Sequence, residues 1–390
     1  MPFIGLSLLA RGELFLRQQH ARSVAQVLAA LEHGQPERII FSYPPLSFLL
    51  ALLYPSTLTL NLAAALLVGA AAWVLWGALR PLGLGTRIAL LAAWVATSAS
   101  AFLATQDVGQ AATLFCFVLA WRGLLDWLQR ERVWGGFVAG MLLGLAFYAG
   151  LYALACGVLA ALATPWASSG LQAATPKERR QALLARVIVV AFPVVMAFAS
   201  WSYLNLINSG DPWLFLKDST AAGPGAPPVT GLLAALRDTG YELLRLPLYM
   251  LVGLAIALKA PGKLPLYLAP LASVILLRAL GFYYPEALAL SACTAAALVA
   301  LSQWRARRWR ALWVMVALLQ IGLSLALPPR DGDLARWRAL LERRGSLATG
   351  KAEVVIAAQH AEYILVATSE ADPAARLAVL ALDRWALEDT

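Results

Sequence analysis

The sequence predicts an all-α polytopic membrane protein with about ten transmembrane helices and a small α+β extracytoplasmic appendage at its C-terminus. Of its 390 residues, 61% are hydrophobic and 14% are charged, whereas soluble domains carry about a quarter charged residues. Apolar stretches of nearly spanning length recur along the chain, and Lys and Arg gather in alternate connections between them. A large soluble enzyme is a poor alternative, because a core of this size could not hide so much apolar surface.

The first element is residues 1–56, which we expect to be an extracytoplasmic or interfacial segment. A short apolar stretch is followed by a helical pattern over residues 24–31. The adjacent prolines of Tyr-Pro-Pro-Leu at residues 43–46 forbid a regular helix through that point. The apolar run after them ends at Pro55 and is too short to cross a membrane, so it predicts an interfacial helix or a re-entrant piece.

The second element is the transmembrane helical domain, residues 57–328. A spanning helix needs roughly 20 apolar residues. Residues 134–166 are ambiguous, because they could form two helices or one long kinked helix that would invert everything after it. The two-helix interpretation keeps the dense basic clusters on one side of the membrane. The expected spans are 57–79, 88–105, 109–128, 134–149, 151–166, 186–207, 244–259, 264–281, 284–303 and 311–328.

The orientation follows from where the basic residues lie between these spans. The turns around Asp107, Gly150 and Glu286 carry almost no Lys or Arg, which is typical of the outer side. We therefore expect both termini to be extracytoplasmic. The clusters expected on the cytoplasmic side are Arg80 and Arg87; Arg130 and Arg132; Lys177, Arg179, Arg180 and Arg186; Lys259 and Lys263; and Arg305, Arg307, Arg308 and Arg310.

Two further segments are expected outside the membrane. The first is an outer loop at residues 208–243, whose Gly- and Pro-rich centre predicts irregular structure. The second is the tail, residues 329–390, which we expect to form a small extracytoplasmic α+β domain. Its expected helices are 333–344 and 372–382, and its expected strands are 354–357 and 363–366.

Most soluble-enzyme chemistry has no counterpart in this sequence. There is no P-loop, GxSxG, HExxH or strand-preceded GxGxxG motif. The three cysteines lie inside apolar runs and the three histidines are not at metal-ligand spacing. The net charge of +9 is explained by cytoplasmic loops, so we expect no nucleic-acid partner. Asn61, Gln110 and Gln320 are expected to bond between helices.

Four short motifs stand out: Arg11 and Glu13 before the Tyr-Pro-Pro-Leu turn, an Asn…Gly-Asp-Pro stretch within residues 201–213, Arg278 before Tyr-Tyr-Pro, and the tail. Together they resemble the GT-C superfamily of membrane glycosyltransferases, which includes protein O-mannosyltransferases and the aminoarabinose transferases of lipid A. Arg11, Glu13 and the Tyr-Pro-Pro-Leu turn are similar to the family's outer-loop acid and its interfacial turn. Residues 201–213 look like its Asn…Gly-Asp-Pro segment. Arg278, followed by Tyr-Tyr-Pro at residues 283–285, resembles its late Arg…Pro element, and the tail resembles the small outer domain of some bacterial members.

The resemblance implies transfer of a sugar from a polyprenyl-phosphate donor to an acceptor on the extracytoplasmic face of a bacterial inner (plasma) membrane. It implies that Glu13 is the general base that deprotonates the acceptor hydroxyl. Arg278 would neutralise the departing lipid phosphate. The further substrate-binding residues that it implies are Arg11, Tyr43, Asp107 and Asp211. It leaves open the sugar, the acceptor and a divalent metal.

The chain departs from the family where a full helix should precede the acid, because only a short apolar stretch precedes Arg11. A misplaced start and a truly absent first helix both stay open. The acid itself is a single Glu13 flanked by Arg11, where the family commonly has an Asp or an acidic pair.

Four of the expected site residues also have a structural alternative. Glu13 can pair with Arg17 one helical turn away. Arg278 can extend its guanidinium to the interface. Asp211 can close a turn before Pro212, and Asp107 can cap the following helix.

Two other functional classes compete with a glycosyltransferase. The first is a non-catalytic GT-C-like subunit or lipid-binding scaffold of an envelope complex, which the departures favour. The second is a transporter, which would need internal repeats or broken helices with polar residues near the middle of the membrane. The lipid bilayer is a partner under all three interpretations.

Overall fold

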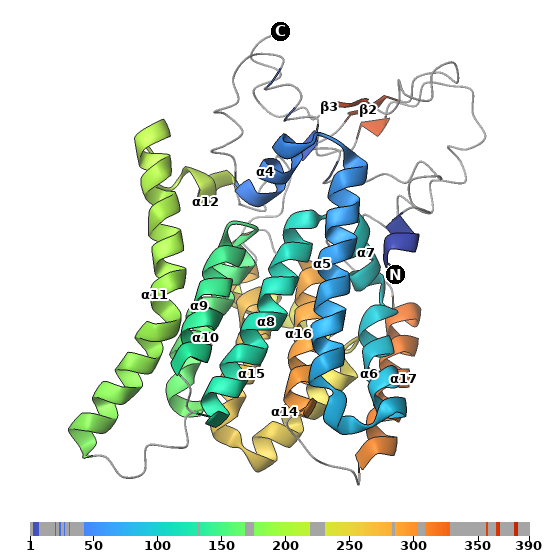
Figure 1. Ribbon diagram of the computed structural model, residues 1–390, viewed down its shortest axis with the longest axis vertical. Coiled ribbons are helices and arrows are strands. Elements are labelled where there is room, and N and C mark those ends of the chain that lie inside the picture. The colour runs from blue at the N-terminus through green and yellow to red at the C-terminus, as the bar shows by residue number, and fades with distance from the viewer. Residues whose placement is uncertain are drawn as a thin grey trace.

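In the computed structural model the chain forms a bundle of helices that run between two ends (Figure 1). The structure describes residues 3–7, 20, 23–24, 27, 31, 43–130, 133–167, 175–218, 231–282, 285–302, 309–327, 356–357, 364–366 and 378–380. The α-helices and the 3-10 helices η1 and η2 are α4 (Pro45–Leu53), α5 (Thr57–Ala78), η1 (Arg80–Leu82), α6 (Leu84–Val95), α7 (Ser98–Gln106), α8 (Val108–Arg130), α9 (Val133–Phe147), α10 (Leu151–Ala167), α11 (Pro176–Ser209), α12 (Leu214–Asp218), α13 (Leu232–Leu243), α14 (Pro247–Lys259), η2 (Pro261–Lys263), α15 (Leu264–Ala279), α16 (Glu286–Ser302) and α17 (Arg310–Ala326).

The helices have the lengths and composition of a membrane protein. Four segments are long and apolar enough to cross a bilayer, and the bent pairs α6–α7 and α13–α14 raise that number to six if each pair is one span. Helices α9, α10, α16 and α17 are apolar but shorter. Each segment expected as a span overlaps one of these helices, so the helical, membrane-type fold is confirmed, and the number of ten crossings stays a prediction. The four long segments are Leu58–Ala78, Val108–Gln129, Pro176–Ser209 and Pro261–Ala279.

Helix α16 lies at the centre of the bundle. Every residue from Glu286 to Leu301 is buried, and the helix contacts α5, α6, α7, α8, α14 and α15. Its sequence allows this, because Ala, Ser, Cys and Thr fill most of its positions and let neighbouring backbones approach on all sides. The site described below forms at one end of this central helix.

Residues 134–166 form two separate helices. Helix α9 ends in a turn in which Tyr148 N–H donates to Leu145 C=O at 3.1 Å and Gly150 N–H donates to Phe147 C=O at 3.0 Å. Helices α9 and α10 then lie side by side, and both pack on the long helix α11 (Figure 1). The two-helix interpretation of this stretch is therefore the one that the structure adopts.

Glycines bring α9 against α11 at very short range. A Cβ atom at Gly140 would lie 2.6 Å from the carbonyl oxygen of Val190, and one at Gly144 would lie 2.8 Å from that of Pro193. The two glycines are four residues apart and so face the same side of α9. Only glycine permits this backbone contact, which resembles the small-residue packing of membrane helices.

One of the expected spans is broken, and a second sharp bend adjoins the span expected at 244–259. The span expected at 88–105 is divided into α6 and α7, which meet at 61°. Thr97 caps α7 by accepting the N–H of Ser100, and the Ser100 hydroxyl in turn donates to the carbonyl of Trp94 at 2.6 Å. The second break lies between α13 and α14, which meet at 106°, with Pro247 as the first residue of α14. Helix α13 forms within the expected outer loop 208–243.

The described residues Ser7 and His20 of the N-terminal segment contact the start of α5. Ser7 donates to the carbonyl of Asn61 at 3.2 Å, and His20 Nδ1 lies 2.5 Å from Asn61 Oδ1, so both contact the first turns of α5. Helix α4 is a short helix at the same end (Figure 1), as an interfacial piece would be. Its Leu46 N–H donates to the carbonyl of Tyr148 at 3.1 Å.

The described part of the tail contains three short strands. They form one antiparallel sheet in the order β1–β2–β3, with Ile356 opposite Leu365 and Leu365 opposite Val379. Strands β1 and β2 fall within the stretches expected as strands. The helix expected at 372–382 is wrong where the structure describes it, because Ala378–Leu380 pairs with Ile364–Val366 as a strand instead. The helix expected at 333–344 lies outside the described residues, so the α+β domain stays a prediction. The strands are β1 (Ile356–Ala357), β2 (Ile364–Val366) and β3 (Ala378–Leu380).

Candidate functional site

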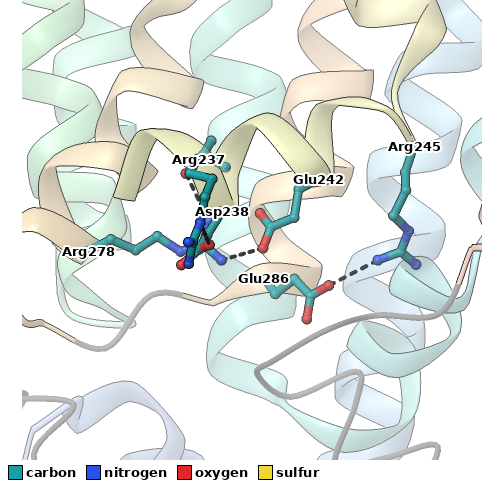
Figure 2. A network of polar contacts seen from close by, with 7 residues as sticks. Arg237, Asp238, Glu242, Arg245, Arg278 and Glu286 are labelled. Atoms are coloured by element: carbon teal, nitrogen blue, oxygen red, sulfur yellow. Dashed lines mark hydrogen bonds and ion pairs between the residues drawn. The ribbon is translucent and has the colours of Figure 1, made fainter. Parts of the chain in front are cut away.

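Two buried arginine–glutamate pairs lie together where α13, α15 and α16 meet (Figure 2). Arg278 donates from Nη2 to Glu242 Oε1 and from Nη1 to Thr239 Oγ1, the latter at 2.8 Å. Arg245 donates from Nη1 to Glu286 Oε1 at 3.0 Å. We call these five residues the paired-arginine cluster.

The positions of these residues on their helices explain the arrangement. Thr239 and Glu242 are three residues apart on α13, so they share one face and can hold the same guanidinium. Arg278 lies in the last turn of α15 and Glu286 in the first turn of α16. A cation at a helix C-terminus and an anion at an N-terminus both interact favourably with the helix dipole.

These charged groups are buried, so removing them from water costs free energy that only a nearby opposite charge can offset. The exposed fractions are 2% for Arg245, 1% for Glu286, 8% for Arg278 and 9% for Glu242. Removing ions from water costs several kcal/mol per ion, so each charge must keep a well-placed partner. The neighbouring Arg237–Asp238 pair differs, because its arginine side chain is 79% exposed. That surface pair is worth at most about 1 kcal/mol.

A small cavity adjoins Arg245. It measures about 10 Å³, which is the room that one water-sized guest needs. We call it the junction cavity, because both helix breaks border it. It is lined by Trp94, Thr97, Ser98, Ala99, Arg245, Leu246, Leu290, Ser291, Thr294 and Ser324.

Of the residues expected at a substrate site, Arg278 belongs to the paired-arginine cluster. Arg11 and the expected base Glu13 lie outside the described residues.

Tyr43 belongs to a separate aromatic group around α4, where its hydroxyl donates to the carbonyl of Phe147 at 2.7 Å. Its ring lies 5.4 Å from that of Phe215 and 6.3 Å from that of Trp201. The Tyr43 hydroxyl thus joins the Tyr-Pro-Pro-Leu turn to the end of α9.

The two expected aspartates hold backbone turns in this structure. Asp107 Oδ1 accepts the backbone N–H of Gln110 at 2.9 Å, and Asp107 Oδ2 accepts the Gln110 side-chain amide at 3.0 Å. Asp211 Oδ1 accepts the N–H of Trp213 at 2.9 Å, across Pro212. These are the capping and turn geometries of the structural alternatives. A role of either carboxylate toward substrate stays a prediction.

No family model, curated protein or solved structure matches this chain.

The described residues contain no group of three or more His, Cys, Asp and Glu side chains that could hold a metal ion. The polar groups of the paired-arginine cluster are guanidinium, carboxylate and hydroxyl groups. Guanidinium groups match phosphate oxygens with paired N–H donors, and carboxylates beside them can accept protons or hydrogen bonds. The paired-arginine cluster is thus suited to an anionic ligand. Such a ligand would accept a hydrogen bond from a guanidinium N–H that is not bonded to Glu242 or Glu286.

The sequence analysis missed four members of the cluster, namely Thr239, Glu242, Arg245 and Glu286. Arg245 and Glu286 could have been found, because each is a charged residue at the border of an apolar run, where an ionisable residue is costly. Glu242 gave a weaker signal, since α13 lies in a segment that was expected to be a loop. Their pairing spans 36 residues for Glu242–Arg278 and 41 for Arg245–Glu286, and no local pattern encodes such separations.

Proposed function

We propose that this chain is a GT-C-like membrane glycosyltransferase that transfers a sugar from a polyprenyl-phosphate donor to an acceptor on the extracytoplasmic face of a bacterial inner membrane. The proposal includes ten membrane crossings and extracytoplasmic termini. One observation carries it: Arg278, which the resemblance assigns to the lipid phosphate, is a buried cation at the end of α15. Ionisable residues at such depth are costly and usually functional.

The proposed reaction uses a base and a cation. Glu13 takes the proton from the acceptor hydroxyl as the acceptor oxygen attacks the anomeric carbon of the sugar. The bond between that carbon and the phosphate oxygen breaks, and the lipid phosphate leaves with the bonding electrons. Arg278 neutralises the charge that develops on the phosphate. Its five N–H groups can serve more than one acceptor, so it can engage phosphate while it still contacts Glu242.

The test replaces the expected base. Membranes that contain the wild-type chain or Glu13→Gln are supplied with a polyprenyl-phosphate donor carrying a radiolabelled hexose, and endogenous membrane components serve as acceptors. We expect the variant to transfer sugar roughly 10²–10⁴-fold more slowly, which is the usual contribution of a general base. Expression and thermal unfolding should match the wild type, because the change is isosteric.

The matched control is Lys263→Gln, which removes a charge at the exposed connection before α15. It should transfer at the wild-type rate. Wild-type transfer by Glu13→Gln would remove the proposed base. Absence of donor turnover by the wild-type chain, together with purification in a fixed complex, would favour the non-catalytic subunit instead.

A transporter is the second candidate, because two helix pairs of the described chain are bent by 61° and 106°. Broken helices that present their ends to a polar site are a common feature of transporter folds. Flux of a labelled anionic substrate into proteoliposomes, with no transfer of sugar, would favour this function over the glycosyltransferase.

A further inference from the structure

Both helix breaks of this chain border the same cavity. The α6–α7 break contributes Trp94, Thr97, Ser98 and Ala99 to the wall of the junction cavity, and the α13–α14 break contributes Arg245 and Leu246. The central helix α16 and helix α17 complete the wall with side chains that include Ser291, Thr294 and Ser324. Two interruptions more than a hundred residues apart in the chain therefore meet at one small polar space.

Two side-chain groups at this cavity have no hydrogen-bond partner among the described residues. They are Arg245 Nε and Ser291 Oγ, and both residues are 2% exposed. A buried polar group without a partner costs about 1–3 kcal/mol, and more when it is charged. Ser98 and Ala99 add the first N–H groups of α7, which have no acceptor within their own helix. The positive end of the α7 dipole lies there as well.

Three acceptors of the cavity wall already hold hydrogen bonds. The carbonyl of Trp94 accepts hydrogen bonds from Thr97 at 3.0 Å and Ser100 at 2.6 Å. The carbonyl of Ser291 accepts the indole N–H of Trp94 at 3.0 Å. Thr294 Oγ1 accepts from Gln320 at 3.2 Å and donates to the carbonyl of Leu290 at 2.9 Å. Arg245 Nε and the first-turn N–H groups of α7 can only donate, so they favour a guest that accepts hydrogen bonds.

We propose that the junction cavity binds one monovalent anion of halide size, such as chloride. An anion is a pure acceptor and satisfies Arg245 Nε, the Ser291 hydroxyl and the first-turn N–H groups of α7 together. A water molecule would need acceptors for its two hydrogens. The cavity volume of about 10 Å³ has room for a single small guest. The site does not depend on the proposed glycosyltransferase activity.

The first test measures thermal unfolding of the purified full-length chain in detergent. Chloride replaces gluconate at constant ionic strength, and the apparent chloride dissociation constant is taken from the rise of Tm. We expect a saturable rise, because a ligand that binds only the folded state stabilises it. Ser291→Ala removes one donor to the anion and should weaken the apparent affinity roughly tenfold.

The matched control is Ser273→Ala, since Ser273 is fully buried but donates within its own helix and lies away from the cavity wall. It should keep the wild-type chloride affinity. Equal Tm in chloride and gluconate would overturn the proposal, and so would a chloride effect that Ser291→Ala leaves unchanged. Crystals grown in bromide give an independent readout. An anomalous peak beside Arg245 Nε supports the site, and water or empty density there refutes it.

Discussion

At the scale of single residues, the most deeply buried ion pairs of the described residues are Glu242–Arg278 and Arg245–Glu286. Each pair is neutral and buried, so its net worth relative to an apolar replacement is small. Losing one partner is different, because the remaining charge stays in a medium that solvates it poorly. The energetic role of each residue in the paired-arginine cluster is thus to keep its partner buried.

Glu242→Ala should lower the free energy of unfolding by about 3–5 kcal/mol, because Arg278 loses its anionic partner while it remains buried. The change can be measured by reversible unfolding in mixed micelles. Asp238→Ala is the control, since it removes a carboxylate of the same helix whose side chain is 36% exposed, and it should cost less than about 1 kcal/mol. The double variant Glu242→Leu/Arg278→Met should recover most of the loss. Equal costs for Glu242→Ala and Asp238→Ala would contradict the buried-pair interpretation.

The polar residues inside the spans were predicted with mixed success. Gln320 bonds between helices as expected, because its amide accepts the N–H of Leu248 on α14 and donates to Thr294 on α16. Gln110 instead bonds to Asp107 beside the start of its own helix. Asn61 contacts His20 of the N-terminal segment. Sequence shows that a buried amide needs a partner, whereas the partner depends on three-dimensional neighbours.

At the scale of helices, hydropathy predicted the segments well and their internal breaks poorly. A window of about 20 residues averages over both halves of a bent pair, so α6 and α7 together look like one span. The break at Thr97 depends on the caps that Thr97 and Ser100 supply, and Ser and Thr also occur inside intact membrane helices. Pro247 marks the second break more clearly, because proline favours the first turn of a helix.

Gly140→Ala should separate α9 from α11 and destabilise the folded chain. The added Cβ would lie 2.6 Å from the Val190 carbonyl oxygen, so the backbones must move apart. Such overpacking costs about 1–3 kcal/mol and should lower Tm in detergent. Gly69→Ala on α5 is the matched control, because nothing lies within 4 Å of its Cβ position. An unchanged Tm for Gly140→Ala would show that α9 and α11 are not in backbone contact.

At the scale of the whole molecule, basic residues that are distant in sequence gather at one end of the bundle. The Arg310 guanidinium lies about 3.5 Å from the Cβ position of Gly83, whose φ of +78° itself requires glycine. Arg87 stacks over Trp76 at 3.2 Å, close to Arg80. The sequence analysis assigned these arginines to one side from charge alone. Their contacts explain how the α5–α6 connection and the start of α17 form a common end.

The ends of α11 should be accessible from opposite sides of the membrane. Asn208→Cys should react with a membrane-impermeant maleimide on intact spheroplasts, and Lys177→Cys should react only after lysis. Both positions are exposed, and Cys116, Cys156 and Cys293 are buried, so native thiols should contribute little labelling. The converse labelling pattern would place residue 208 in the cytosol. Because the proposed topology puts Arg278 on the same side as residue 208, it would exclude a role of Arg278 in sugar transfer on the outer face.

The length of α11 has a consequence for where this protein can work. Its 34 residues extend about 51 Å, well beyond a hydrocarbon layer of roughly 30 Å. Helices α9 and α10 cover only part of its surface, because only 22% of its most apolar 18-residue stretch is buried inside the protein. The tilt of α11 therefore depends on the thickness of the surrounding lipid layer as well as on its packing against α9 and α10. Thinner and thicker bilayers will change its tilt, and with it the contact of Gly140 and Gly144 with α11.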